Sequence, residues 1–322
     1  MKLTDKIFTD ENAAREHLEA LRWSNGCSCP LCGGTEKIKP VKMMSKPSVS
    51  NPESIEVKGY YHCGDCRRKF TVRTGTVYER SHVPLNIWVL ATHLLCSSKK
   101  GMSAHQLHRM LGVTYKTAWF MAHRIRESMI EDNNGPMGGP GKNVQADETY
   151  IGKKKDVPEL RTSGEPFKNG PRGAAIKNAV VSLVSEGKAR TFHVDRADSD
   201  TVRNILVTNV SRDTDLHTDE SRLYTKVGRE FANHETVNHS AGEYVRKGIT
   251  TNHVENYFSV FKRGMIGTYQ HCSEKHLGRY LVEFDFRYNR RDIKDFERTI
   301  HALKGAEGKR ITYRRSIARK VA

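Results

Sequence analysis

Two aspartates lie beside short apolar runs, where a carboxylate is uncommon. Asp147 follows residues 144–146 and Asp219 follows residues 216–218, and each aspartate is followed at once by a glutamate. Because both runs have the composition of a strand, we expect each aspartate at or near the end of a strand. A carboxylate beside a core strand costs free energy unless a cation neutralises it. A divalent metal is the natural partner.

A third carboxylate, Glu255, lies in a segment with helical periodicity at residues 252–263. Its apolar stripe would press the helix onto a sheet and leave Glu255 at the border of the buried face. This stripe consists of Val254, Phe258, Phe261 and Met265. Lys262 follows Glu255 by seven residues, which is two helical turns, so the two side chains share a face. A cation there could hold a DNA phosphate next to a metal.

The cysteines suggest a second metal. Four of the seven form two C-x-x-C pairs, Cys29 with Cys32 and Cys63 with Cys66. Four thiolates close a tetrahedral shell around Zn²⁺, so the pairs predict a structural zinc site. The 30 residues between the pairs exceed the commoner spacing, and a redox-active C-x-x-C is the alternative. Cys27 is a substitute ligand, whereas Cys96 and Cys272 are expected to be ordinary small apolar residues.

Residues 103–129 have the pattern of two helices joined by a short turn. Gly112 makes the turn, and Thr114 caps the second helix. The second helix would bury one side and expose a polar one; the buried side holds Ala118, Met121 and Ile125, and the polar side holds Lys116, His123, Arg124 and Arg126. This is the helix-turn-helix arrangement, whose second helix can lie in the major groove of DNA. We therefore expect Lys116 and Arg124 to contact DNA, with a plain helical hairpin as the alternative.

The rest of the chain supplies the elements that would position these residues. Strands are expected at 144–151, 178–185, 189–194 and 215–218, with a hairpin turn at 186–188 and helices at 10–23, 201–210, 252–263 and 275–288. This order predicts the α/β class, with a mixed sheet flanked by helices. The expected domains are an N-terminal helix with the cysteine segment (1–80), the helical module (81–132), a Gly/Pro-rich linker (133–143), a catalytic domain (144–300) and a loose basic tail (301–322).

The composition indicates a polyanionic partner. Lys and Arg number 54 against 37 Asp and Glu, which gives a formal net charge of +17. Cations placed on phosphates release condensed counterions, so the charge favours a nucleic acid as partner, with a merely soluble basic protein as the alternative. The helix-turn-helix pattern makes double-stranded DNA the expected nucleic acid. The apolar runs are far shorter than the ~20 residues that span a bilayer, and no secretory signal follows the N-terminus. We expect an intracellular, cytoplasmic protein associated with the nucleoid.

On these residues the chain resembles the DDE transposases and integrases, and most closely the bacterial insertion-sequence transposases of the ISXO-like type with an N-terminal zinc ribbon. The matching motifs lie at 29–33, 61–66, 74–76, 146–150, 217–219, 238–239, 251–255, 262–264 and 283–290, and the resemblance covers roughly residues 10–295. It implies a ribonuclease H-like catalytic domain and two-metal phosphoryl transfer. Mg²⁺ or Mn²⁺ would be held by Asp147, Asp219 and Glu255.

The resemblance leaves one ligand open. Some relatives carry Asn in place of the third acid, so Asn252 is the alternative to Glu255 as a metal ligand. We expect Asn252, Lys262 and Arg263 to contact DNA near the site.

The predicted function is that of a DNA transposase, which cuts the ends of its element and joins the freed 3′-hydroxyl groups to target DNA. Two ends must be held together, so a homodimer or larger synaptic assembly is expected. The main alternative is a sequence-specific, zinc-containing DNA-binding regulator with an inactive catalytic domain. A nuclease that cuts without joining is a further alternative, and stoichiometric zinc would exclude a thiol oxidoreductase.

Other polar residues have ordinary interpretations that compete with a role in a site. Asp195, Asp198 and Asp200 are expected to cap the helix near residue 201 rather than to bind metal. His217 would share the face of Asp219, and His239 follows an extended run; each could position DNA or be structural. The lysines at 153–155 and the basic tail could bind phosphates or be solvated, and the tail's charged and aromatic residues are Lys309, Arg310, Tyr313, Arg314, Arg315, Arg319 and Lys320.

Overall fold

The computed structural model describes residues 2–311 except 45–52, 55, 132–134, 158, 162–163, 167, 169, 238–244 and 247–248. Contacts divide the chain into two units. Among the described residues, the helical unit contains those up to Ser98, Met102–Ile130 and 293–311, and the sheet unit contains Lys99–Gly101 and Glu131–Asp292. No helix in the described part of the chain is long and apolar enough to cross a membrane.

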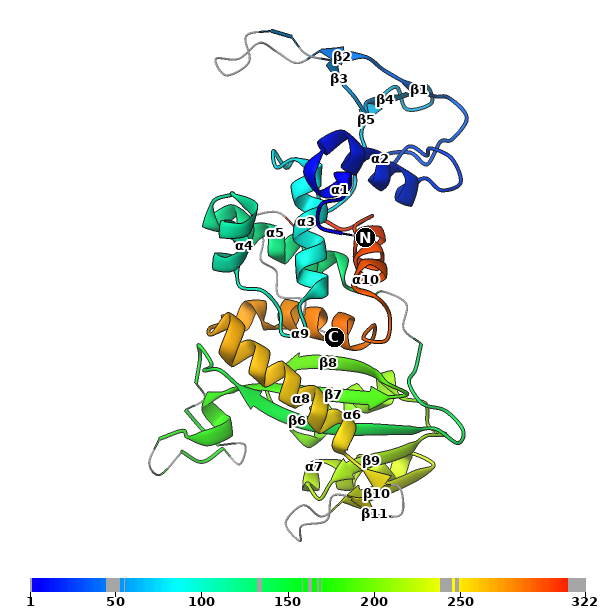
Figure 1. The fold of residues 1–322 in the computed structure, drawn as a ribbon. Helices are drawn as coiled ribbons and strands as arrows, with labels where there is room; N and C mark the ends of the chain where they lie inside the picture. The colour runs from blue at the N-terminus through cyan, green and yellow to red at the C-terminus, as the bar shows by residue number, and fades with distance from the viewer. Residues whose placement is uncertain are drawn as a thin grey trace. The chain divides into compact units, whose positions relative to one another are not determined.

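The sheet unit is built on five strands in the order β10-β9-β6-β7-β8 (Figure 1). They are β6 (Asn143–Ile151), β7 (Asn178–Ser185), β8 (Lys188–Val194), β9 (Asp215–Asp219) and β10 (Asn233–Val237). Strands β6, β7 and β8 pair antiparallel, whereas β9 runs parallel to β6 and β10 runs parallel to β9. The predicted α/β class with a mixed sheet is therefore confirmed.

Helices cover both faces of this sheet. They are α6 (Ser199–Asn209), α7 (Arg222–Thr225), α8 (Asn252–Gly264) and α9 (Glu274–Tyr288). Successive residues of a strand point to opposite faces. Accordingly Val181 and Leu183 of β7 pack with α6 and α7, while Val180 and Val184 pack with α8 and α9. Every residue of β7 is buried, as expected for a central strand covered on both sides.

The predicted elements of this unit agree with the observed ones to within two residues at each end. The hairpin between β7 and β8 turns at Glu186 and Gly187, which have φ angles of 46° and 75°. Two positive φ angles in succession match the twist of the adjoining strands. Strand β10 was not predicted, because it is largely exposed and has no apolar alternation. Smaller elements are η1 (Gly173–Ile176), η2 (Val227–Glu230), η4 (Met265–Tyr269, a π-helical turn), β11 (Val245–Arg246) and β12 (Ile249–Thr250).

The helical unit combines helices with a small ribbon of short strands. Its helices are α1 (Lys6–Thr9), α2 (Glu11–Arg22), α3 (Leu85–Ser97), α4 (Ala104–Leu111), α5 (Tyr115–Ser128) and α10 (Asp295–Lys304). The ribbon consists of β1 (Ile38–Pro40), β4 (Tyr61–Cys63) and β5 (Lys69–Phe70) in one sheet, with β2 (Met43–Met44) paired to β3 (Glu56–Val57). Its hydrophobic cluster includes Trp23, Tyr61 and Phe70, whose rings contact one another.

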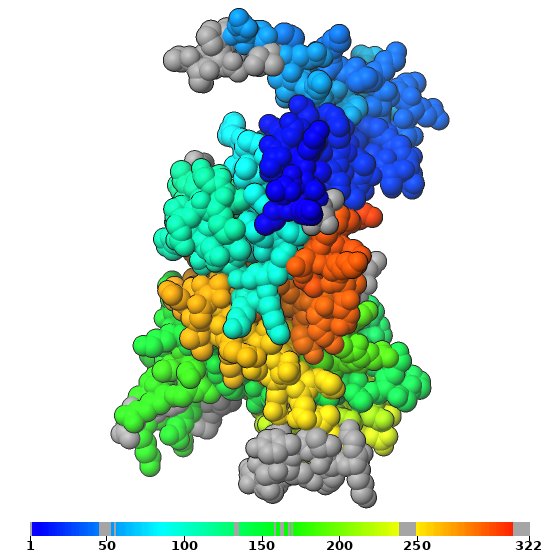
Figure 2. Space-filling view, in the orientation of Figure 1, coloured from blue at the N-terminus to red at the C-terminus, as the bar shows by residue number. Residues whose placement is uncertain are grey.

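The C-terminal segment corrects one prediction. Residues from 301 on were expected to form a loose tail, but α10 packs against α3 (Figure 2). Ala302, Leu303, Ala306 and Ile311 are buried. The expectation was wrong for residues 301–311, because the few apolar residues of this segment are buried and so hold it against the rest of the helical unit. Residues 312–322, with Tyr313, Arg314 and Arg315, lie outside the described residues.

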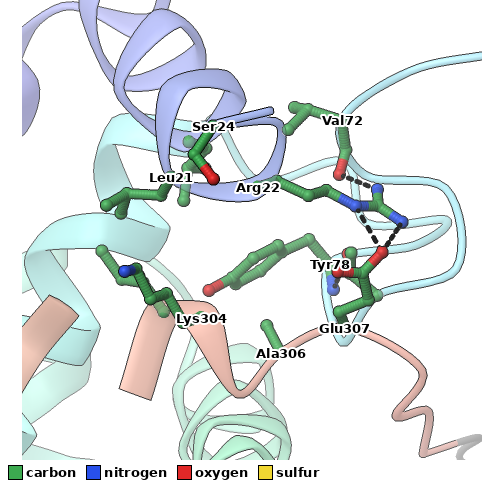
Figure 3. A pocket seen from close by; sticks show the side chains of 11 residues that line it. Leu21, Arg22, Ser24, Val72, Tyr78, Lys304, Ala306 and Glu307 are labelled. Carbon is green, nitrogen blue, oxygen red and sulfur yellow. Dashed lines mark hydrogen bonds and ion pairs between the residues drawn. The ribbon is translucent and has the colours of Figure 1, made fainter. Parts of the chain in front are cut away.

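A cavity of about 280 Å³ marks the junction of α2, the segment after the ribbon and the C-terminal segment (Figure 3). Arg22 of α2 donates to the carbonyl oxygens of Val72 and Thr74, each at 2.8 Å. The same guanidinium pairs with Glu307 at 3.0 Å. Arg22 thus ties three separate stretches of sequence together at one edge of the cavity.

Candidate catalytic site

Asp147 and Asp219 lie on neighbouring parallel strands. Gln145 of β6 is paired with His217 of β9, and each aspartate lies two residues further along its strand. Since alternate residues of a strand share a face, Gln145, Asp147, His217 and Asp219 all point to the same side of the sheet. This is the side that α8 covers, because Gln145 accepts hydrogen bonds from the start of α8.

The positions of the two aspartates in their strands differ from the prediction. Asp219 is the last residue of β9, as expected. Asp147 is not at a strand end, since β6 continues to Ile151 and remains paired with β7 there. The predicted bounds of this strand, 144–151, agree with β6, but they place Asp147 near its middle rather than at its end. Each carboxylate accepts a backbone hydrogen bond: Asp147 from the N–H of Glu148 at 2.7 Å, and Asp219 from that of Ser221 at 3.0 Å.

Helix α8 brings Glu255 to this face in its first turn. The side chain of Glu255 is half-buried, as predicted for the border of the apolar stripe. Its Oε1 accepts a hydrogen bond from the hydroxyl of Thr251 at 2.8 Å. Asn252, the alternative ligand, is exposed at the start of the helix.

A groove of about 420 Å³ runs between β6 and α8. Its lining is acidic on the strand side and basic at the far end of the helix; the lining residues are Asp147, Glu148, Thr149, Glu255, Phe258, Ser259, Lys262 and Arg263. The structure therefore brings together two of the three predicted catalytic acids and two of the predicted DNA-contacting cations. Asp219 lies on the neighbouring strand and is not part of this lining.

Electrostatics link all three acids. Burial, together with the charges of Glu148, Asp219 and Glu255, raises the pKa of Asp147 to about 7. The oxygen atoms of the three acids are nevertheless not all close together. Among the described residues, the four cysteines are the only group of three or more possible metal ligands whose ligand atoms all lie within 4.8 Å of one another. Hard carboxylate oxygens that repel one another in a half-buried groove are the donor set that Mg²⁺ or Mn²⁺ prefers.

Glu148 has a partner that the sequence did not indicate. Tyr224 of α7 is completely buried, and its hydroxyl donates to Oε2 of Glu148 at 2.7 Å. Burial raises the pKa of Glu148, while this hydrogen bond acts in the opposite direction. Nothing in the sequence around Tyr224 marks it as a partner of a residue 76 positions away.

Of the remaining candidate residues, some have a structural role and others have no role that the structure identifies. Asp198 caps α6 by accepting from the N–H of Thr201 at 2.9 Å, as expected for the structural interpretation. His217 is 7% exposed, and no hydrogen-bond partner of its Nδ1 occurs in the part of the chain that the structure describes. Lys154 donates to the carbonyl oxygen of Asp195 at 2.5 Å. Asn238 and His239 lie outside the described residues.

Helices α4 and α5 are joined by the predicted turn, and α5 has the predicted cap at Thr114. Ser103 and Thr114 accept hydrogen bonds at the two helix starts, and Gly112 adopts a left-handed conformation with φ of 64°. Lys116 is exposed near the start of α5. Beside it the exposed ring of Tyr115 stacks on His105 with ring centroids 4.3 Å apart, a surface feature that was not predicted.

Arg124 requires a correction. It was expected to contact DNA, but its side chain is 7% exposed, lies over the ring of Phe120 and donates to the carbonyl oxygen of Ile311 at 3.4 Å. His123 and Arg126, also expected on the polar side, are buried. Arg124 is covered by the segment that follows α10, which local periodicity could not reveal.

The four predicted zinc ligands meet in the ribbon. The sulfur atoms of Cys29, Cys32, Cys63 and Cys66 all lie within 4.8 Å of one another. Cys27, the substitute ligand, is not in this group, and Cys96 is buried as predicted. The pKa of the Cys63 thiol is lowered to about 7, first by the backbone N–H of Cys66. Four thiols in one cluster fit a structural zinc site better than two separate redox pairs.

Comparison with known proteins assigns families to the two parts of the chain that hold these groups of residues. Residues 138–289 match the family described as "ISXO2-like transposase domain", and residues 9–69 match the "Transposase zinc-ribbon domain". A protein of Halobacterium salinarum (strain ATCC 700922 / JCM 11081 / NRC-1), described as an uncharacterized protein in transposable element ISH50, is 30% identical over 291 residues. The alignment covers 88% of this chain and 92% of that protein.

Two solved structures are similar over part of the chain. The Mos1 transposase paired-end complex with left transposon end has 14% sequence identity and a TM-score of 0.28, with 69% of this chain and 80% of that chain covered. The Mos1 strand transfer complex has 12% identity and a TM-score of 0.20, with 63% and 76% covered. Scores of this size do not bear on the fold or the site.

The matched domains define the class: a transposase, which is an enzyme of the polynucleotidyl-transferase type, with a structural zinc ribbon. The chain belongs to the ISXO2-like transposase family and is a DNA transposase.

Proposed function

We propose that this transposase cuts the ends of its element and joins them to target DNA by metal-dependent phosphoryl transfer, with Asp147, Asp219 and Glu255 as the catalytic metal ligands. The observation that carries the proposal is the groove between β6 and α8, where Asp147 and Glu255 face Lys262 and Arg263. Acids at one end could hold cations, and bases at the other could hold DNA phosphates.

The electrostatics of Asp147 support a divalent cation. Its raised pKa reflects burial and three neighbouring carboxylates, a penalty that a cation would remove. Mg²⁺ or Mn²⁺, when bound, would stabilise the charge on the attacking and leaving oxygens of phosphoryl transfer. The chain's own residues would bind the ions, hold the phosphate through Lys262 and Arg263, and align the scissile bond along the groove.

The fold is consistent with a ribonuclease H-like domain. The resemblance implies a mixed sheet flanked by helices, and this sheet has three antiparallel strands, two parallel ones and helices on both faces. For the third ligand, the geometry favours Glu255 over Asn252, since Glu255 lines the groove whereas Asn252 is exposed at its helix start.

DNA would also be contacted outside the groove. The capped helices α4 and α5, with Lys116 exposed, support a helix-turn-helix contact. Cys29, Cys32, Cys63 and Cys66 would hold the zinc that stabilises the ribbon. Because cutting and joining act on two ends, we propose a homodimer or larger synaptic assembly; a cytoplasmic location near the nucleoid and a bacterial source remain predictions.

The decisive experiment is a strand-transfer assay with the element's own end sequences and Mg²⁺ or Mn²⁺. Wild type is compared with Glu255→Gln and with Asn252→Ala, and DNA binding is measured in parallel. Joined products from wild type and Asn252→Ala but not from Glu255→Gln would support the assignment. Wild-type binding without cleavage would favour the regulator with an inactive catalytic domain, and cleavage without joining would favour a nuclease.

A further inference from the structure

The start of α8 is capped in an unusual way. Thr251 occupies the N-cap position, where a threonine hydroxyl normally accepts a hydrogen bond from the first free N–H groups of the helix. Thr251 makes no such bond. Its hydroxyl instead donates to Oε1 of Glu255 at 2.8 Å.

The capping role is taken by a residue from the sheet. Oε1 of Gln145 accepts from the backbone N–H of His253 at 3.0 Å and from that of Val254 at 3.3 Å. These are the second and third residues of α8, the donors that an N-cap side chain usually satisfies. Gln145 is only 2% exposed and lies on β6, two residues before Asp147 on the same face.

This exchange has a geometric consequence for the acids. Because Gln145 satisfies the helix donors, the hydroxyl of Thr251 is available to orient the carboxylate of Glu255. Because Gln145 belongs to β6, the helix start is fixed to the strand that carries Asp147 (Figure 1). Two contacts thus set the separation of Asp147 from Glu255. Gln145 fixes the start of α8 to β6, and Thr251 fixes the carboxylate of Glu255 to the start of α8.

We propose that Gln145 and Thr251 are positioning residues, which set the carboxylate of Glu255 against Asp147 for metal binding. The proposal rests on the catalytic assignment made above. Neither residue needs to touch DNA or the reacting atoms. A role confined to helix stability would lower the melting temperature alone, whereas a positioning role also weakens metal binding by the folded protein, since partners of metal ligands orient them.

The test uses the full zinc-loaded chain and measures Mn²⁺ binding directly from the signal of free Mn²⁺ in electron paramagnetic resonance. Thr251→Val removes the hydroxyl at nearly constant shape, and Gln145→Met removes the acceptor at similar length. We expect each to raise the Mn²⁺ dissociation constant by about 10- to 100-fold, with cleavage requiring correspondingly more Mn²⁺. Thr251→Ser, which keeps the hydroxyl, should restore binding to within about threefold of wild type.

Asp198→Ala is the matched control, because Asp198 caps α6 on the opposite face of the same sheet. It should lower the melting temperature about as much as Thr251→Val but leave Mn²⁺ binding unchanged. Wild-type Mn²⁺ affinity in folded Thr251→Val, with weak binding in Glu255→Gln, would overturn the positioning role alone. Wild-type affinity in Glu255→Gln would overturn the catalytic assignment and this proposal with it. If Gln145→Met fails to fold, the comparison of Thr251→Val with Thr251→Ser still tests whether the Thr251 hydroxyl positions Glu255.

Discussion

At the scale of single residues, the candidate site is governed by the electrostatic cost of Asp147. Its carboxyl group is held in the middle of β6 beside Glu148, with Asp219 and Glu255 near by, and its pKa is raised to about 7. Such an arrangement is unfavourable without a cation. It persists because the fold around it is fixed by buried apolar residues on both faces of the sheet.

Replacing Asp147 should separate catalysis from DNA binding. Asp147→Asn removes a charge that would hold metal but leaves Lys262 and Arg263 in place, so we expect cleavage to fall by at least about 10²- to 10³-fold. DNA affinity should stay within about twofold. Asp195→Asn, which alters an exposed acid after β8, is the control and should cleave normally. Cleavage assays and gel-shift titrations measure the two effects, and joint loss in Asp147→Asn would indicate misfolding or a wrong assignment.

Two cations on α5 should behave differently when removed. Arg124 is buried against Phe120, so Arg124→Ala should destabilise the protein by about 1–3 kcal/mol. Lys116 is exposed, so Lys116→Ala should change stability by less than about 0.5 kcal/mol. If Lys116 contacts a phosphate, its loss should also reduce the salt dependence of DNA binding by about one unit of slope. Denaturant unfolding and binding at several salt concentrations distinguish the two; an unchanged salt slope would remove Lys116 from the interface.

At the scale of elements, Asp285 joins two helices to the sheet. From α9 its carboxylate accepts from the hydroxyl of Tyr257 on α8 at 2.6 Å, and from the hydroxyl and N–H of Thr191 on β8 at 2.8 and 2.9 Å. Burial nevertheless raises the pKa of Asp285 to about 7. This residue lies in one of the motifs of the family resemblance, and its contacts supply a structural reason for its presence there.

The shift at Asp285 predicts a pH dependence of stability. Its folded pKa lies above the unfolded value, so between about pH 4 and pH 7 the folded state retains a proton that the unfolded state releases. Its contribution is therefore fully present below about pH 4 and is lost as the pH rises to 7, by at most about 4 kcal/mol. Asp285→Asn should not show this loss of stability. The free energy of unfolding of the variant, relative to that of wild type, should therefore be higher at pH 8 than at pH 4.

Chemical denaturation across this pH range measures the effect. Asp292→Asn, at an exposed acid just beyond α9, is the control and should follow the wild-type curve. Parallel curves for wild type and Asp285→Asn would show that Asp285 does not carry a raised pKa.

The ribbon is the second element whose behaviour can be predicted. Its strands have only two or three residues each, and its hydrophobic cluster is small, so metal must supply much of its stability. Cys63→Ser should lose zinc and expose Trp23, whereas Cys272→Ser should keep one zinc per chain. Atomic absorption and tryptophan fluorescence report the two outcomes. Full zinc content in Cys63→Ser would rule out the four-cysteine site.

At the scale of the whole molecule, the net charge of +17 contrasts with the acidic strand side of the groove. The basic excess favours DNA at long range, whereas the three acids repel phosphate unless a cation is bound. Metal would therefore be needed both for the reaction and for close approach of the scissile phosphate.

Assembly on DNA is the prediction at this scale. Two element ends must be held together, so we expect the chain to form a dimer or larger complex when both ends are supplied. Light scattering after size-exclusion chromatography, with single-end and paired-end DNA, measures the mass. Unrelated DNA of equal length is the control. A complex that stays monomeric on paired ends would contradict the synaptic assembly.

The sequence by itself determined the local elements and the chemical types of the site. The spacing of apolar residues predicted the sheet strands β6 to β9 and the helices α8 and α9. This was possible because the spacing that distinguishes a strand from a helix is visible within a short stretch of sequence. Paired cysteines predicted the ribbon's metal cluster for the same reason, since two C-x-x-C turns present their sulfurs locally and four thiols suit one ion.

Only the tertiary structure decided which side chains are buried and which distant residues meet. Arg124 is covered by a segment almost 190 residues further on, and Gln145 reaches a helix more than 100 residues away. These contacts form because packing brings together surfaces from remote parts of the chain, and a pattern read along the sequence does not contain that information.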